Sequence, residues 1–84
     1  MAYKIYVGNL AYATDDAGLK AAFEEYGTVE SASVVLDKYT GRSRGFGFVE
    51  MATQEEGEAA VKAMDGKELD GRELRVNEAR PKEQ

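Results

Sequence analysis

Hydrophobic and polar side chains alternate from Lys4 to Leu10, with Ile5 and Val7 on the same side of the alternation. A period of two is typical of a half-buried strand. The spacing then changes, because apolar residues recur at i, i+3, i+4 and i+7, as on one face of a helix. These helical positions are Leu19, Ala22, Phe23 and Tyr26. Thr14 is expected to cap this helix at its start, and Gly27, in a left-handed conformation, is expected to end it.

Two β-rich segments follow, at residues 29–36 and 44–51, and a hairpin loop over residues 37–43 joins them. In the first segment, the inward positions are expected to be Ala32, Val34 and Leu36. In the second segment, the inward positions hold Gly45, Gly47 and Val49. The alternate side chains of the second segment are therefore expected to face away from the core.

A second helix and a last strand complete the pattern. Thr53, followed three residues later by Glu56, is a capping box that predicts a helix start. The apolar stripe of this helix consists of Gly57, Ala60, Val61 and Met64. Asp65-Gly66 predicts its end, and Asp70-Gly71 predicts a tight turn into the last strand. The inward residues of that strand are expected to be Leu74 and Val76.

The element order is therefore strand, helix, strand, strand, helix, strand. Two amphipathic helices and four short strands bury their apolar faces best as two layers, with both helices on one face of an antiparallel sheet. The sequence predicts an α+β fold, a ferredoxin-like βαββαβ sandwich, over residues 1–80, with a short tail at residues 81–84. The other face of the sheet is left to solvent.

Alternation places several side chains on this open face, namely Tyr6 from the first strand, and Arg44, Phe46, Phe48 and Glu50 from the third. Three exposed aromatic rings form an apolar patch that favours a binding partner. Bases stack on aromatic rings at about 1–3 kcal/mol per base, and flanking cations contact phosphates. The pattern therefore predicts a surface for an unpaired nucleic-acid strand. Burial of the rings in the core is the alternative, and it is disfavoured because glycine and valine already fill the inward positions.

Length and composition narrow the remaining function classes. With 84 residues and 43% hydrophobic content, the chain has room for one domain with one modest core. It contains no cysteine and no histidine, so disulfides and the usual zinc sites are excluded, and no cofactor is expected. No apolar stretch approaches the roughly 18 residues of a membrane-spanning helix, and Met1-Ala2-Tyr3-Lys4 does not resemble a signal peptide. A cytoplasmic location is therefore expected, and we expect a monomer.

The formal net charge of −5 is unusual for a nucleic-acid binder, because phosphate contacts normally require a basic surface. The acidity is concentrated in the two predicted helices, which hold seven acidic and two basic residues with their flanks. The rest of the chain holds nine of each. The acidity is therefore expected on the helical layer as a solvated surface, which leaves the opposite face of the sheet neutral or locally basic.

Two short motifs carry a resemblance to a known family. Arg44-Gly45-Phe46-Gly47-Phe48-Val49-Glu50-Met51 resembles the ribonucleoprotein octapeptide, and Ile5-Tyr6-Val7-Gly8-Asn9-Leu10 resembles its hexapeptide companion. Both lie in the expected strands and in the expected order. Over residues 3–80 the chain resembles the RNA recognition motif family, especially the short single-domain RNA-binding proteins of cyanobacteria and the N-terminal domain of plant glycine-rich RNA-binding proteins.

The resemblance implies a role for each matching position. Tyr6 and Phe48 would each stack under one base, and Phe46 would pack between two sugars. The cations expected at the RNA backbone are Arg44, Lys4 and Arg42. The residues expected to line the platform and hydrogen-bond to base edges are Arg75, Asn77, Ala79 and Arg80. The implied partner is single-stranded RNA, with single-stranded DNA as an alternative, in RNA metabolism or post-transcriptional regulation.

Some residues of the motifs serve packing in this resemblance. Gly45 and Gly47 would face the helices and let them approach the sheet. Met51 stands where the family usually has Phe or Tyr, at a position that points into the core. Gly57 replaces a helix alanine at a cost of about 1 kcal/mol in helix propensity, and either permits close contact between helix and sheet or is merely tolerated.

Two other functions are weighed as alternatives. One is a peptide-binding variant of the same fold, which often lacks the aromatic rings or has an aromatic residue after an arginine in the turn before the last strand. That turn reads Asp70-Gly71-Arg72-Glu73-Leu74 here. The other is a small acylphosphatase, which shares the topology but needs an arginine in the loop after the first strand, where residues 8–13 contain none. With no histidine, no cysteine and no convergent acid pair, an enzyme is not expected.

Overall fold

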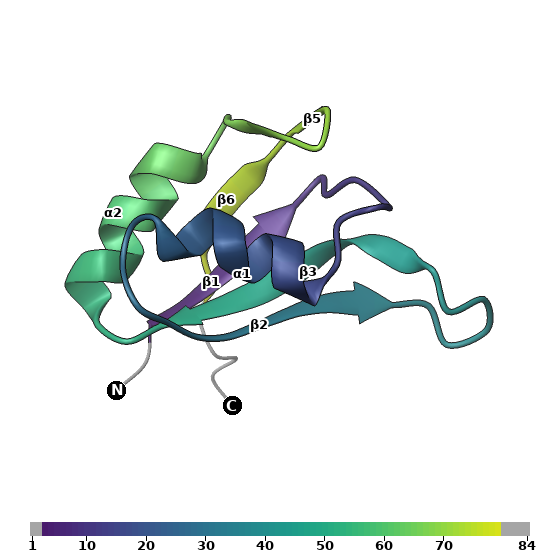
Figure 1. The fold of residues 1–84 in the computed structure, drawn as a ribbon, viewed down its shortest axis with the longest axis horizontal. Coiled ribbons are helices and arrows are strands. Elements are labelled where there is room, and N and C mark those ends of the chain that lie inside the picture. The colour runs from purple at the N-terminus through teal and green to yellow at the C-terminus, as the bar shows by residue number, and fades with distance from the viewer. Residues whose placement is uncertain (1–2, 80–84) are drawn as a thin grey trace.

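The computed structural model describes residues 3–79, which form a four-stranded sheet covered on one face by two helices (Figure 1). In chain order the elements are β1 (Tyr3–Gly8), α1 (Asp16–Glu24), β2 (Val29–Leu36), β3 (Ser43–Met51), α2 (Gln54–Met64), β4 (Glu68–Leu69), β5 (Arg72–Glu73) and β6 (Arg75–Glu78). The sheet has the order β2-β3-β1-β6, and neighbouring strands are antiparallel. The ferredoxin-like βαββαβ sandwich expected from the sequence is therefore confirmed.

The hydrophobic core lies between the sheet and the helical layer. Helix α1 packs on β2 and β3, whereas α2 packs mainly on β1 and β6 (Figure 1). Both predicted helical stripes face this core, and Met51 is fully buried in it, as expected. The largest fully buried side chains are Phe23, Ile5, Leu10, Leu19, Met51, Met64, Leu74, Val7, Val49 and Val76. None of the described helices is long and apolar enough to cross a membrane.

The start of α1 differs from the prediction by one residue. Asp15, and not Thr14, is the N-cap, and its Oδ1 accepts a hydrogen bond from the Gly18 N–H at 2.8 Å. Thr14 is buried, and its hydroxyl donates to Oδ2 of Asp70 at 2.5 Å. Both residue types are good caps. The choice depends on Asp70, which is distant in sequence, so the local pattern does not reveal it.

The prediction for Gly27 is also wrong. Helix α1 ends at Glu24, and Gly27 does not have a positive φ. A Cβ at Gly27 would lie 2.7 Å from the Cβ of Glu56 in α2. The Glu56 carboxylate also accepts a hydrogen bond from the N–H of Thr28 at 3.2 Å. Gly27 therefore leaves room for the first turn of α2 to contact the chain that follows α1.

Helix α2 begins and ends where the sequence predicts. Thr53 is the N-cap and accepts a hydrogen bond from the Glu56 N–H at 3.1 Å, although the Glu56 side chain does not complete the reciprocal half of the capping box. Gly66, with φ of 84°, follows the end of the helix. A Cβ at Gly57 would overlap the ring of Tyr3. Gly57 therefore permits the close contact between helix and sheet that was one of its two interpretations.

The inward position expected for Leu36 is wrong, because this side chain is 57% exposed. The pairing of β2 with β3 shifts register between Val34 and Leu36. A register shift of this kind interrupts the regular alternation of inward and outward side chains. Val34 is buried as predicted, and its N–H donates to Oδ1 of Asp16 at 2.7 Å, which fixes the strand to the start of α1.

The segment between α2 and β6 contains a small hairpin that the sequence pattern does not resolve. Strands β4 and β5 pair around Asp70 and Gly71, whose φ angles of 53° and 86° suit the predicted tight turn. Asn9 anchors this hairpin to the end of β1. Its Nδ2 donates to the Glu73 carbonyl oxygen at 2.6 Å, and its Oδ1 accepts from Arg72 at 2.6 Å.

Candidate nucleic-acid interface

The pairing of β1 with β3 places three aromatic rings on the face of the sheet that the helices leave open. Tyr6 and Phe48 are directly opposite each other, and Phe46 is opposite Gly8. Opposite residues of an antiparallel pair point to the same face. The neighbouring pair of Ile5 and Val49 is fully buried on the core side. The rings therefore point away from the core, as the alternation predicts.

The three rings contact one another and form one surface, which we call the aromatic platform (Tyr6, Phe46 and Phe48). The Tyr6 centroid lies 5.9 Å from that of Phe46 and 5.9 Å from that of Phe48. The Phe46 and Phe48 centroids are 6.2 Å apart, with ring planes at 89°. Each ring is half-buried. Their contacts hold the rings in place and leave part of each one open to a partner.

Gly8 makes room for the Tyr6 ring. A Cβ at this position would lie 2.7 Å from the Tyr6 hydroxyl oxygen and 2.9 Å from a carbon of the ring. Tyr6 therefore lies over the backbone of the next residue but one. The hexapeptide motif thus pairs an aromatic residue with the glycine that its ring covers.

Gly45 and Gly47 do not let the helices approach the sheet, so that expectation is wrong. A Cβ at Gly47 would overlap the carbonyl oxygen of Ser33 and lie 3.0 Å from the Cα of Val34, both in β2. Gly47 therefore permits close packing between two strands. Gly45 has a φ of 89°, which favours glycine, and its carbonyl accepts a hydrogen bond from the Leu10 N–H at 2.8 Å.

Polar side chains surround the ring of Phe48. The Nζ of Lys4 lies 4.9 Å from the ring centroid, which is a cation–π contact. Glu50 is opposite Lys4 on one side and Ser31 on the other. Its Oε1 accepts a hydrogen bond from the Ser31 hydroxyl at 3.1 Å. A cation, a carboxylate and a hydroxyl therefore lie in one row of the sheet beside the platform.

Strand β6 forms the other border of the platform. Asn77 is opposite Tyr6, and Arg75 is opposite Gly8; both side chains are exposed. The N–H of Ala79 donates to the Lys4 carbonyl at 2.9 Å, so this N–H is not available to a base edge. Arg80 lies outside the described residues. The structure thus places Arg75 and Asn77 beside the rings, as the resemblance implies.

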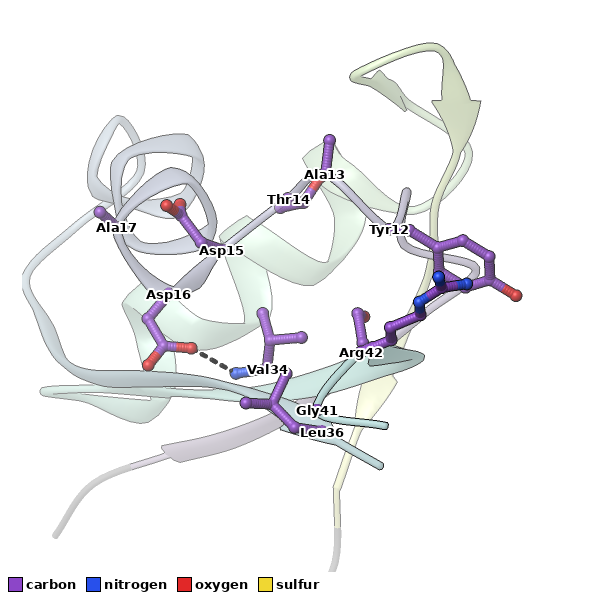
Figure 2. A pocket seen from close by; sticks show the side chains of 11 residues that line it. Tyr12, Ala13, Thr14, Asp15, Asp16, Ala17, Val34, Leu36, Gly41 and Arg42 are labelled. Atoms are coloured by element: carbon purple, nitrogen blue, oxygen red, sulfur yellow. Dashed lines mark hydrogen bonds between the residues drawn. The ribbon is translucent and has the colours of Figure 1, made fainter. Parts of the chain in front are cut away.

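Arg42 lies apart from the platform. It lines a hollow of about 690 Å³ on the helical side of the sheet, between the start of α1 and the loop after β2, together with Tyr12 (Figure 2). Arg44 is exposed, and its positive charge acts on the Asp37 carboxylate. Three cationic side chains are expected to contact the RNA backbone, and among them Lys4 is the one that contacts a ring of the platform, that of Phe48.

Asp37 orders the loop that leads into β3. Its Oδ1 accepts hydrogen bonds from the N–H groups of Tyr39 at 2.7 Å and Thr40 at 3.1 Å. The bond from Tyr39, then that from Thr40, and further the charge of Arg44 lower the pKa of the Asp37 carboxyl below its usual value of 3.8. Because the ionised form is favoured in the folded loop, its stabilising effect is present above the usual pKa and is lost as pH falls through the lowered pKa.

Acid is therefore expected to loosen the loop only below the usual titration range of an aspartate. The amide NMR signals of Tyr39 and Thr40 should titrate together, with a midpoint below 3.8. In Asp37→Asn, which keeps the acceptor oxygen and removes the charge, this titration should disappear while the loop stays formed. A midpoint at or above 3.8 for the wild-type amides would contradict this account of the loop.

Two hydroxyl side chains beside the platform were not identified from the sequence. Ser33 is opposite Phe48, and Ser31 contacts Glu50. The signal was present, because the alternation that directs Ala32 and Val34 inward directs these serines to the open face.

Within residues 3–79 no cluster of acidic side chains is suited to hold a metal ion.

Comparison with known proteins identifies the family of this chain. A family profile described as RNA recognition motif matches residues 5–75. The chain is 52% identical over 77 residues to glycine-rich RNA-binding protein 4, mitochondrial, of Arabidopsis thaliana. The aligned region covers 92% of this chain and 57% of that protein. It is 52% identical over 79 residues to the putative RNA-binding protein RbpB of Nostoc sp.. This aligned region covers 94% of this chain and 77% of that protein.

A solved structure gives the same result for the fold. The crystal structure of RNA binding protein PG1 superposes with a TM-score of 0.89 at 45% sequence identity, covering 95% of this chain and 99% of that one. The relatives are named as RNA-binding proteins and not as enzymes. On the match to its sequence profile over residues 5–75, the chain belongs to the RNA recognition motif family.

Proposed function

We propose that this protein binds single-stranded RNA by stacking bases on the aromatic platform. The observation that carries the proposal is the set of three contacting rings on the sheet face that the two helices leave open, with ring centroids 5.9–6.2 Å apart. An unpaired base can lie flat on such a ring, whereas the bases of a duplex are already stacked and paired. Tyr6 and Phe48 each carry one base in this proposal, and Phe46 packs between sugars.

The surrounding groups support this assignment. Arg75 and Asn77 border the rings on β6, where they reach base edges, and Lys4 and Arg44 supply positive charge for phosphates. The names of the relatives, which are RNA-binding proteins and ribonucleoproteins, support RNA over other partners. Single-stranded DNA has the same stacking faces and is a second ligand to test. A monomer acting in RNA metabolism or post-transcriptional regulation is part of the proposal.

The cellular compartment stays a prediction. The sequence favours a cytoplasmic location, while some relatives are named as mitochondrial or chloroplastic proteins. The aromatic platform does not depend on this choice, because stacking requires only the rings and an unpaired strand.

Titration with short RNA at several salt concentrations tests the proposal. Single-stranded RNA is expected to bind, and an RNA duplex of the same length is expected to bind at least about tenfold more weakly, because its bases are not available for stacking. With two or three phosphate contacts, the logarithm of the binding constant should fall with the logarithm of salt concentration with a slope of about −2 or shallower. Equal binding of duplex and single strand, or a much steeper slope, would mean that charge and not stacking drives binding.

A further inference from the structure

We infer that Glu50 selects the base that stacks on Phe48 and favours guanine over uracil at that position. The inference rests on the proposed function, because it concerns a base on the platform. Glu50 stands two residues after Phe48 in β3, so the two side chains lie on the same face, about 7 Å apart along the strand. The edge of a base on the ring is therefore within reach of this carboxylate.

The Glu50 carboxylate is held in place and keeps free hydrogen-bonding capacity. Ser31 donates to its Oε1 at 3.1 Å, which limits the rotation of the side chain. Within residues 3–79, Oε2 accepts no hydrogen bond, and the ion pair present joins Lys20 and Glu24 in α1. Lys4, although opposite Glu50, has its ammonium group over Phe48. The carboxylate is thus oriented at the border of the platform and, among residues 3–79, forms no ion pair.

The negative charge of Glu50 determines which part of the RNA can lie next to it. A phosphate would be repelled by the carboxylate, so the backbone is expected to pass elsewhere and a base edge to face Glu50. A base that stacks on Phe48 takes the place of the Lys4 ammonium above the ring. The ammonium then lies at the rim of the base, where it can pair with an acceptor atom. This inference therefore assigns Lys4 to the base and leaves the phosphate contacts to the other cations.

An ionised carboxylate only accepts hydrogen bonds, so it discriminates among the four bases by the donors that each one presents. Guanine presents two adjacent donors, N1–H and N2–H, and these match the two oxygens of a carboxylate with two parallel bonds. Its O6 is the acceptor next to them, which suits an ammonium group. Adenine and cytosine present one amino group beside a ring nitrogen acceptor. Uracil presents one N3–H between two carbonyl oxygens, whose lone pairs oppose the carboxylate.

The position at Tyr6 differs in this respect. Its neighbour on β6 is Asn77, whose amide both donates and accepts hydrogen bonds. An amide can turn to suit each base, so the nucleotide on Tyr6 is expected to be read with little preference. The selectivity of the platform is therefore concentrated at Phe48.

The experiment compares the wild type with Glu50→Gln. The ligands are short uridine oligomers that carry one central guanosine, inosine or uridine. Inosine lacks the N2 amino group, so it removes one of the two proposed bonds without changing the stacking face. The wild type should bind the guanosine oligomer about tenfold more tightly than the uridine oligomer, since a bidentate pair contributes about 1–3 kcal/mol of discrimination. Glu50→Gln should bring this ratio close to one.

Replacement of guanosine by inosine should weaken binding to the wild type and have little effect on Glu50→Gln, so the two changes are coupled. The matched control is Glu55→Gln, which removes the same charge from an exposed position on α2, in the helical layer. It should keep the preference for guanosine. Thermal unfolding of each variant shows whether the fold is intact.

The outcomes separate this inference from the proposed function. Equal binding of the guanosine and uridine oligomers by the wild type overturns the role of Glu50 and leaves stacking intact. A Glu50→Gln protein that loses affinity for all three oligomers to the same extent also overturns it, because the effect would be a general one. Failure of the wild type to bind any of the oligomers overturns the inference and the proposed function together.

Discussion

Replacement of Phe48 by alanine is expected to weaken single-stranded RNA binding by about 10–100-fold, because one stacked base contributes about 1–3 kcal/mol. The ring contacts both Tyr6 and Phe46, so its loss also removes support from the rest of the platform. Fluorescence anisotropy with a labelled short RNA measures the change. Unchanged affinity would remove the stacking role of Phe48.

Two further variants show whether stacking is the cause. Phe48→Leu keeps an apolar side chain but has no aromatic face, and it should lose most of the same affinity. Tyr12→Ala removes a ring that is 75% exposed beside the hollow in the helical layer, and it should bind RNA like the wild type. Because Phe48 is half-buried among other rings, Phe48→Ala should lower the free energy of unfolding by about 1 kcal/mol. The affinity of this variant should therefore be measured well below the Tm of the variant.

Gly47→Ala is expected to have the largest effect on stability. Its Cβ would overlap the Ser33 carbonyl oxygen and lie 3.0 Å from the Cα of Val34. These are backbone atoms of a paired strand, so β2 and β3 must separate locally to admit the methyl group. We expect a loss of about 3 kcal/mol in the free energy of unfolding, at the upper end for overpacking. Tm should fall by about 10 °C or more.

The control for this substitution is Gly18→Ala in α1. The new Cβ would be 3.2 Å from Oδ1 of Asp15, which belongs to a side chain that can adjust. Alanine also has a higher helix propensity than glycine by about 1 kcal/mol, so the variant should be as stable as the wild type or more so. Chemical denaturation of both variants measures the difference. A wild-type Tm in Gly47→Ala would show that β2 moves away from β3 at little cost.

The fold and the platform could be predicted from the sequence because their pattern is local and regular. In β1 and β3 the alternation is unbroken around Tyr6 and Phe48, so each side chain could be assigned to a face. The helical stripes were equally clear, since a period of 3.6 differs from a period of two over a few turns. The contact of three rings from two strands followed from pairing the two segments in the expected order.

The errors at Thr14, Leu36 and Gly47 depend on contacts with other segments of the fold. Thr14 could not be distinguished from Asp15 as a cap without knowing that Asp70 takes its hydroxyl group. The exposure of Leu36 depends on a register shift between two strands, and the role of Gly47 depends on the backbone of the neighbouring strand. Such effects belong to tertiary packing, which local spacing does not encode.

The hydrogen bond between Ala79 and Lys4 affects how two copies of this domain can be joined in one chain. It brings both ends of the described chain to the same end of the paired strands β1 and β6, beside the Lys4 that contacts Phe48. Two copies joined in tandem through these ends would hold their RNA surfaces near each other with only a short linker. A short linker gives an effective concentration of about 1 mM, so a tandem protein should capture longer RNA far more tightly than the separate domains.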